Sequence, residues 1–288
     1  YNGSNPNNGA CIMMYGSGAV TFEHNEIHHC GSGIFLKGDP NQNLDTFTIR
    51  YNLFHNIGEF RSGVPSGSAI IMHVGAANPP DRPTRVYQNV VRDSFDAAIR
   101  IWRFSDTVAV NNPMNSKVVN NTFYNVPTGY WIDNELFPNA GHVFRNNLVV
   151  NTSLNALAIN ATANDKTRLD SEHNLFWNFG TFASTAAGNF TLAGWRSTFG
   201  QDNASPASIE ADPTFVDAAA RDFRLQTGSP ARTLGRDFLD LNGNGSTTDT
   251  IPAGAYLTGS EVIGRTSGPL PPPVRPPSAP SRLRRVTP

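Results

Sequence analysis

The chain has 288 residues, with 22 basic and 23 acidic side chains and a formal net charge of −1. Charged residues make up 16% of it, so the sequence offers neither the basic field that binds a nucleic-acid backbone nor an acidic tail. No apolar run approaches the length of a membrane span. We therefore expect a protein that binds no nucleic acid and does not insert into a membrane.

The two cysteines, Cys11 and Cys30, lie near the start of the chain. A single pair at this separation is compatible with one disulfide bond. Two buried free thiols that act as small apolar side chains fit equally well. The sequence leaves these two states open.

Residues 24–180 contain one pattern that recurs six times. Each copy has an asparagine, an apolar residue two positions later and, in five copies, Asn or Asp two positions after that. The copies are "HNEIHHCG", "YNLFHNIG", "QNVVRDSF", "NNTFYNVP", "NNLVVNTS" and "HNLFWNFG", with their shared asparagines at Asn25, Asn52, Asn89, Asn121, Asn147 and Asn174. Such self-similarity at a fixed period indicates a stacked repeat architecture.

The repeat favours a solenoid of short strands. Its windows alternate β-branched or aromatic residues at a period of two, and no 3.6-residue stripe is present. Asn tolerates the left-handed conformation of a sharp corner, and its amide can bind the equivalent amide of the next coil. We therefore predict an all-β parallel β-helix in which Asn52, Asn89, Asn121 and Asn147 form one structural column.

The corner motif resembles the right-handed parallel β-helix superfamily of secreted polysaccharide lyases and related carbohydrate-active proteins. The resemblance covers residues 9 to about 180, so residues 1–180 are predicted to form the coils. A second stretch, which begins at "TLAGWRSTFGQD", is similar to the C-terminal cap of secreted bacterial β-helix proteins and assigns residues 181–264 to a last coil and cap. The resemblance implies secretion or display at the cell surface and a polysaccharide partner.

Residues 265–288 are rich in proline and are predicted to form an extended linker. The segment "PPSAPSRLRRVTP" resembles the opening of a fibronectin type III module. We therefore expect further domains in the same natural chain.

The strands that follow each corner by one turn are expected to form the first sheet: "GSGIFLKG", "SAIIMHVG", "AIRIWRF", "GYWIDNE" and "ALAINA". Alternation turns Ile34, Ile70, Ile99, Tyr130 and Leu157 inward, together with Leu36, Met72, Ile101, Ile132 and Ile159. Two outward columns follow, namely Phe35, Ile71, Arg100, Trp131 and Ala158, and Lys37, His73, Trp102, Asp133 and Asn160. Long segments flank this face (58–68, 75–84, 103–117 and 134–141), which favours a walled groove.

Cations and aromatic rings share these columns, and this combination suits an acidic sugar. In lyases of the superfamily a Lys or Arg commonly removes the C5 proton of a uronate. We therefore predict Lys37 or His73 as the base, with neighbouring positive charge lowering the pKa of Lys37, and Arg100 as the carboxylate binder. Phe35, Trp102, Trp131 and Asp133 are predicted to bind the substrate. No cofactor is required in this reading.

Two other functions stay open. A glycoside hydrolase needs two carboxylates about 5 to 9.5 Å apart, and Asp133 is a candidate with Glu135, Asp96 or Asp106 nearby. A non-catalytic carbohydrate-binding, adhesive or structural module needs no such pair. The first-sheet columns favour the lyase over the hydrolase, since no two carboxylates pair in them.

Two further groups were considered as metal ligands. In "DLNGNGSTTD", the residues Asp240, Asn242, Asn244 and Asp249 are spaced like the oxygen ligands of a calcium loop, and a hydrogen-bonded loop is the alternative. His28, His29 and His55 are expected on the third sheet. Zinc binding by His28 and His29 is disfavoured, because neighbouring residues of a strand point to opposite faces.

Overall fold

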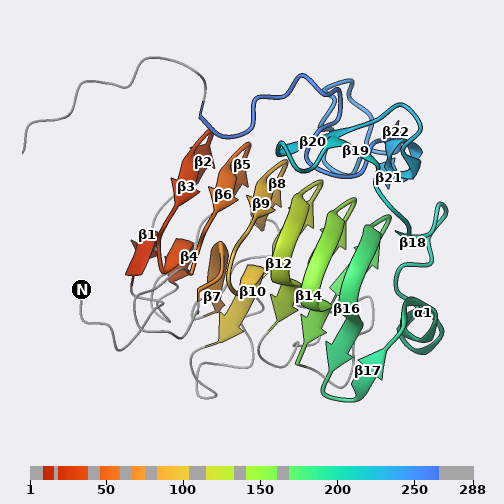
Figure 1. The fold of residues 1–288 in the computed structure, drawn as a ribbon, viewed down its shortest axis with the longest axis horizontal. Coiled ribbons are helices and arrows are strands. Elements are labelled where there is room, and N and C mark those ends of the chain that lie inside the picture. Colours follow the sequence, from red (N-terminus) through yellow and green to blue (C-terminus); the bar gives the residue numbers. More distant parts are fainter. Residues whose placement is uncertain are drawn as a thin grey trace, which may run out of the picture.

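The computed structural model describes residues 9–15, 19–37, 46–58, 67–74, 83–103, 115–132, 141–160 and 169–265. The predicted linker after residue 265 lies outside these ranges, as do most of the long segments beside the first sheet. Within the described ranges the chain winds into stacked coils of parallel strands, followed by one short helix and a loop-rich C-terminal segment (Figure 1).

Three sheets run along the stack, and each coil contributes one strand to each sheet in the order first, second, third. The first sheet contains β1 (Ala10–Tyr15), β4 (Ser32–Lys37), β7 (Ile70–Val74) and β10 (Ala97–Arg103). The second contains β2 (Val20–Glu23), β5 (Phe47–Arg50), β8 (Thr84–Tyr87), β11 (Ser116–Val119), β13 (His142–Arg145) and β15 (Leu169–Glu172). The third begins with β3 (Glu26–His28), β6 (Leu53–His55) and β9 (Val90–Arg92).

The later coils join the third sheet to the first through long bent strands. These are β12 (Thr122–Ile132), β14 (Leu148–Ile159) and β16 (Leu175–Thr185), whose first halves extend the third sheet and second halves the first. The register shifts between Val126 and Thr128, where the strands bend. Pairing between coils is parallel throughout the described solenoid, as the repeat predicts.

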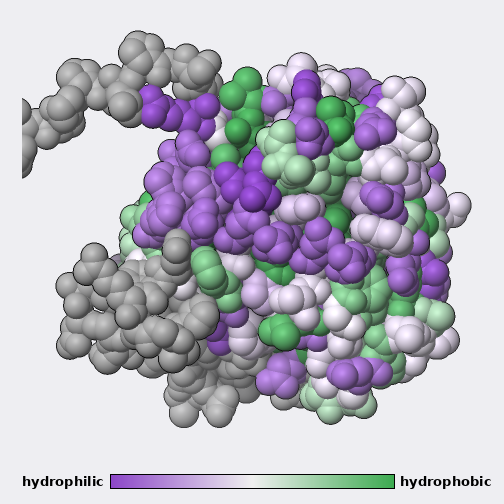
Figure 2. Space-filling view, viewed as in Figure 1, coloured by the Kyte–Doolittle hydropathy of each residue, from purple (hydrophilic) through white to green (hydrophobic). Residues whose placement is uncertain are grey.

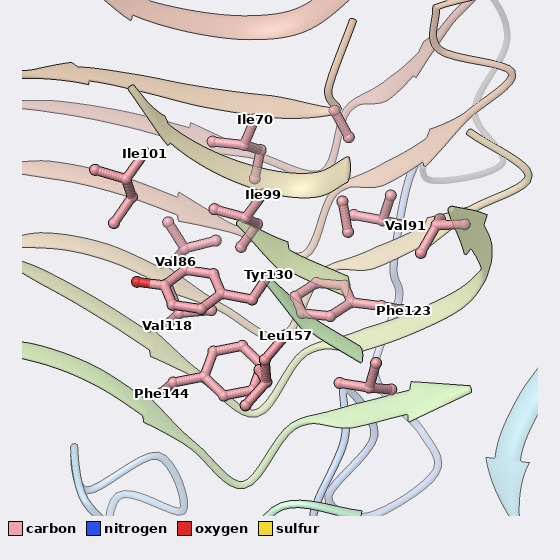
Figure 3. Close-up of a cluster of buried hydrophobic side chains, with 14 of the residues drawn as sticks. Ile70, Val86, Val91, Ile99, Ile101, Val118, Phe123, Tyr130, Phe144 and Leu157 are labelled. Carbon is pink, nitrogen blue, oxygen red and sulfur yellow. The ribbon is translucent and has the colours of Figure 1, made fainter. Parts of the chain in front are cut away.

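Apolar side chains from all three sheets fill the interior (Figure 3). The first sheet supplies Ile70, Ile99, Ile101, Tyr130 and Leu157, the second Val86, Val118 and Phe144, and the third Val91 and Phe123. All ten inward residues predicted for the first sheet are buried in this core. Stacked aromatic pairs such as Phe22 and Phe47, with ring centroids 6.5 Å apart, continue the packing from coil to coil.

The predicted asparagine column is confirmed as a hydrogen-bonded ladder. The backbone N–H and the side-chain amide of Asn89 both donate to Oδ1 of Asn121, at 3.1 and 3.0 Å. Asn121 donates in the same way to Asn147 at 3.0 and 3.1 Å. The same contacts link Asn25 to Asn52, Asn52 to Asn89 and Asn147 to Asn174. These buried amides satisfy the polar groups that the corner would otherwise leave unpaired.

The left-handed conformation expected of these asparagines lies elsewhere, and that part of the prediction is wrong. Positive φ angles occur at the residue before each ladder asparagine, for example 53° at Gln88 and 54° at Asn120. A second series, His29, Asn56, Asp93, Asn125, Asn151 and Asn178, has positive φ at the corner after the third sheet. The ladder residue must keep its amide in line with the next coil, so the chain turns one position earlier.

The segment after β16 first adds to the interior and then folds back outside it. It contains β17 (Gly188–Phe190), α1 (Leu192–Phe199), β18 (Ile209–Glu210), β19 (Phe215–Asp217), β20 (Asp222–Leu225), a 3-10 turn (Pro230–Thr233), β21 (Gly235–Arg236) and β22 (Thr250–Ile251). Leu192 and Trp195 of α1 belong to the interior core. β18 pairs with β16 as a further strand of the third sheet, and residues 211–263 pack on the outer face of that sheet, over Val90, Leu148 and Leu175 (Figure 1).

Cys11 and Cys30 form a disulfide with Cα atoms 5.6 Å apart, which settles the alternative that the sequence left open. The bond links β1 to the corner that follows β3, so it lies in the first coil. Among the described residues, no helix has the length and apolar character needed to cross a membrane.

Candidate functional site

The strands of the first sheet pair the backbones of the described site residues in the predicted register. Phe35 pairs with Ile71, Ile71 with Arg100 and Arg100 with Trp131, while Ala158 extends this column. In the second column the backbone of Lys37 pairs with that of His73, and His73 with Trp102. Neighbouring strands lie roughly 4.8 Å apart, so each residue is next to its partner in the following coil.

Part of the predicted site lies outside the described residues. This holds for Asp133 and for the side chains of Lys37, His73 and Trp102, although the backbone of those three is described. The segments that follow these strands also lie outside the described residues, namely 38–45, 75–82, 104–114 and 133–140. The column order is thus a structural observation, and the functional roles of these side chains remain predictions.

Phe35 differs from the expectation of an accessible ring. Its side chain is 2% exposed and Ile71 beside it is fully buried, yet neither belongs to the interior core. Both therefore lie on the outer face of the sheet and are covered there. A ring in this position supports its neighbours by packing and does not offer a face to a sugar.

Arg100 and Trp131 form the best-defined part of the site. The guanidinium carbon of Arg100 lies 4.0 Å from the centroid of the Trp131 ring, a cation–π contact between neighbouring coils. Asp96 Oδ2 lies 4.0 Å from Nη1 of Arg100 and accepts a hydrogen bond of 3.0 Å from Ser68 Oγ. These contacts hold a flat, positively charged group over an aromatic ring, which suits a carboxylate ligand.

Two residues of this face were missed as members of the site. Tyr15 of β1 pairs with Lys37 and extends its column by an aromatic side chain that is 54% exposed. Alternation in "ACIMMY" could have revealed it, but β1 precedes the first copy of the asparagine motif. Asp96 was predicted only as a carboxylate for hydrolysis, but it directly precedes β10 and lies within ion-pair distance of Arg100 in that strand.

The proposed calcium loop is closed by its own hydrogen bonds. The side-chain amides of Asn242 and Asn244 donate to Oδ2 of Asp249, and Gly245 N donates to Oδ1 of Asp240 at 3.0 Å. The buried carboxylate of Asp237 accepts from the backbone of Leu241 at 2.8 Å. Two of the four expected ligands thus turn N–H groups, which cannot bind calcium, toward Asp249.

His28, His29 and His55 gather on the third sheet, contrary to the argument from alternation. His29 has φ 54°, and this corner conformation brings its Nδ1 to 2.7 Å from Nδ1 of His28. The rings of His28 and His55 stack at 4.9 Å, and His55 Nε2 lies 3.0 Å from Glu26 Oε1. Hydrophilic side chains dominate the surface over β3 and β6 (Figure 2).

These histidine contacts join neighbouring rings and give no metal geometry. In the described part of the chain, no group of three or more His, Cys, Asp or Glu side chains is arranged to hold a metal ion. The argument against zinc from opposite strand faces is nevertheless wrong, because the strand ends at His28 and the corner residue returns to the same side.

The comparisons with known proteins agree with the parallel coils. Residues 7–194 match the family model described as the right-handed beta helix region. Because the match covers more than half of the chain, the protein belongs to the right-handed β-helix family. No curated protein matches the sequence. The fold is compatible with carbohydrate-active proteins, but a shared fold does not assign a reaction.

Proposed function

We propose that the protein is an extracellular polysaccharide lyase that cleaves an acidic, uronate-containing glycan on the outward face of its first sheet. The strand register carries the proposal, since it pairs the backbone of Lys37 with that of His73 and sets Arg100 beside Trp131. The disulfide of the first coil supports secretion or exposure at the cell surface, where oxidising conditions preserve such bonds.

In the proposed reaction Lys37 or His73 removes the proton from C5 of the uronate. The electron pair of that bond forms the C4–C5 double bond, the glycosidic bond at C4 breaks, and the departing oxygen takes up a proton. Arg100 would bind the substrate carboxylate and stabilise the negative charge that develops as C5 loses its proton. Trp131, Trp102 and the exposed Tyr15 would stack on sugar rings.

A non-catalytic carbohydrate-binding or adhesive module is the second candidate. The observation that favours it is the Asp96 carboxylate, which already lies 4.0 Å from Arg100 and competes with a substrate carboxylate for it. In that case the groove would hold a glycan by stacking without cleaving it. A glycoside hydrolase, with Asp133 and a second carboxylate such as Asp96, ranks below both.

Ultraviolet absorbance of the unsaturated product separates these functions. The full chain is incubated with a panel of uronate polymers and with neutral polysaccharides, and absorbance is followed together with reducing ends. A lyase produces both signals on a uronate, a hydrolase produces reducing ends alone, and a binding module produces neither.

Single substitutions test the roles proposed for Lys37 and Arg100. We expect Lys37→Ala to abolish turnover with an unchanged melting temperature, because an outward side chain adds little to the core. Arg100→Ala should chiefly raise KM for carboxylated substrates. Arg85→Ala removes an exposed cation from β8 of the second sheet and serves as the matched control. Full activity of Lys37→Ala would contradict its role as the base, and cleavage of no uronate would reduce the site to a binding surface.

A further inference from the structure

A hollow of about 350 Å³ lies on the outer face of the third sheet, apart from the proposed catalytic columns of the first sheet. Its floor belongs to the outer face of the third sheet in the later coils, and its wall is the segment 212–226 that folds over this face. The volume falls at the lower end of the range of about 300–1,000 Å³ that is typical of small-ligand sites. All residues that line it are described.

The floor is an aromatic and apolar strip that crosses three coils. Tyr124 pairs with Val150, and Val150 pairs with Trp177, so the three side chains share one outward column. Tyr124 is fixed from behind by Phe223, whose ring centroid lies 4.9 Å away. The Trp177 indole, in contrast, is 39% exposed although the C-terminal segment covers the strands beside it. An exposed indole beside a covered apolar face marks a surface for a ligand.

The wall presents oxygen atoms and amides to this strip. Oδ1 of Asp212 accepts a 2.8 Å hydrogen bond from Thr214 N, and the carboxylate is exposed. Gln226 donates from Nε2 to Phe215 O at 2.8 Å, which orients its side-chain amide in the wall. Asn151 accepts at Oδ1 from Asn178 at 2.8 Å and lines the same hollow.

Thr214 supplies the second, independent observation. Its φ of 47° is a left-handed conformation that a β-branched residue adopts only under strain. Thr214 lines the hollow, and its Oγ1 lies just beneath this surface, buried and with no hydrogen-bond partner among the described residues. An unpaired buried hydroxyl costs stability, and rotation of the Thr214 side chain toward a ligand in the hollow would give this hydroxyl a partner.

We propose that this hollow is a second binding site, for a neutral saccharide that stacks on Trp177 and exchanges hydrogen bonds with Asp212, Thr214 and Gln226. Aromatic rings bind the apolar faces of sugars, and carboxylate, amide and hydroxyl groups bind sugar hydroxyls. No lysine or arginine lines the hollow, and Asp212 repels a uronate, so the ligand class differs from that of the first-sheet groove. The inference does not rest on lyase activity.

Calorimetric titration of the full chain tests the site with neutral glucose, mannose, galactose and xylose oligosaccharides, and with an oligouronate as the opposing arm. We expect at least one neutral oligosaccharide to bind, and Trp177→Ala to weaken it at least tenfold without lowering the melting temperature. Leu154→Ala, which removes another exposed apolar side chain from β14, should bind as the parent does. Arg100→Ala should also leave this binding unchanged, which separates the site from the first-sheet groove.

Thr214→Val distinguishes a binding role from a structural one. The variant keeps the β-branched shape and removes only the hydroxyl, so the melting temperature should stay the same or rise while the neutral oligosaccharide binds more weakly. The proposal is overturned if no neutral oligosaccharide binds, if binding survives Trp177→Ala, or if only the oligouronate binds here. Loss of lyase activity in other variants has no bearing on these outcomes.

Discussion

At the scale of single residues, the corner asparagines could be predicted because each side-chain amide binds both neighbouring coils, so asparagine recurs at the same position of the repeat. Each must both donate to and accept from an equivalent residue, so the same residue type recurs in every coil. The residue before it adopts the left-handed conformation but varies between His, Tyr, Gln and Asn. Only the backbone conformation of this residue is constrained, and several residue types adopt it, so the sequence shows no recurring residue there.

The first prediction concerns Asn121, a buried member of the ladder with the same set of hydrogen bonds as Asn52 and Asn89. Its amide donates to Val86 O, Val119 O and Asn147 Oδ1, and its Oδ1 accepts two hydrogen bonds from Asn89. Asn121→Ala leaves several buried groups unpaired, at about 1–3 kcal/mol each, so we expect a loss of about 4 kcal/mol or more. Chemical denaturation measures it.

Asn125→Gly is the control for this variant. Asn125 also links two coils, through Asp93 at 2.7 Å, but it is exposed and has positive φ, which glycine adopts freely. Its loss should cost far less. If the two variants lose the same free energy of unfolding, burial is not what makes the ladder asparagines stabilising.

The second prediction concerns His142, a histidine inside the solenoid. Burial lowers its pKa to about 4, and Ser116 Oγ lies 2.9 Å from its Nδ1. The unfolded chain binds a proton near pH 6.5 and the folded chain does not, so this contribution to stability is complete above pH 6.5 and is lost as the pH falls toward 4. At about 1.4 kcal/mol per pKa unit, the loss amounts to about 3 kcal/mol.

Denaturation midpoints measured from pH 7 to pH 4 test this dependence. His142→Asn cannot titrate in this range, so its stability should fall less with acid than that of the parent chain. His173, whose pKa burial also lowers, acts in the same direction in both proteins. Leu154→Ala, which changes no titratable group, should retain the parent's pH dependence. A parallel fall for parent and His142→Asn would rule out His142 as a source of acid sensitivity.

At the scale of elements, alternation was sufficient to predict both faces of the first sheet. Side chains of a strand alternate strictly, so the inward set from Ile34 to Ile159 fixed the outward columns as well. Accessibility could not be predicted in this way, because it depends on what covers the sheet. Phe35 is outward and nevertheless buried.

Alternation also fails where a strand ends. The sequence "EIHHCG" reads as one continuous strand, but β3 ends at His28 and the corner at His29 returns its ring to the same side. The hollow beside Trp177 was missed for a related reason. Its floor follows the repeat, whereas its wall comes from residues 212–226, which lack any repeat and reach the third sheet only through tertiary packing.

At the scale of the whole molecule, a stack of coils is weakest at its ends, because an end coil has only one neighbour. The C-terminal end gains α1, with Leu192 and Trp195 in the core. The first coils are held by the Cys11–Cys30 disulfide and by the segment around residues 262–264, which returns to them. In this segment Gly264 N donates to Tyr51 O at 2.8 Å, and Val262 O lies 3.0 Å from His24 Nδ1. The last described residues thus brace the first coils.

The last prediction tests this brace with two glycines that share a conformation. Gly264 and Gly259 both have φ 86°, so alanine causes similar backbone strain at either position. A Cβ at Gly264 would lie 2.9 Å from Leu53 Cβ, whereas at Gly259 its nearest neighbour is Arg224 Cδ at 3.8 Å. Gly264→Ala must therefore move away from β6, and Gly259→Ala need not.

Hydrogen exchange of the backbone amides reads out the difference. We expect Gly264→Ala to speed exchange in β3 and β6, next to the displaced segment, and to leave β14 and β16 protected, because each coil of a solenoid depends mainly on its immediate neighbours. Gly259→Ala should change exchange around its own turn alone. If both variants leave β3 and β6 as protected as in the parent chain, the brace does not stabilise the first coils. The disulfide and the asparagine ladder would then be sufficient to keep these coils folded.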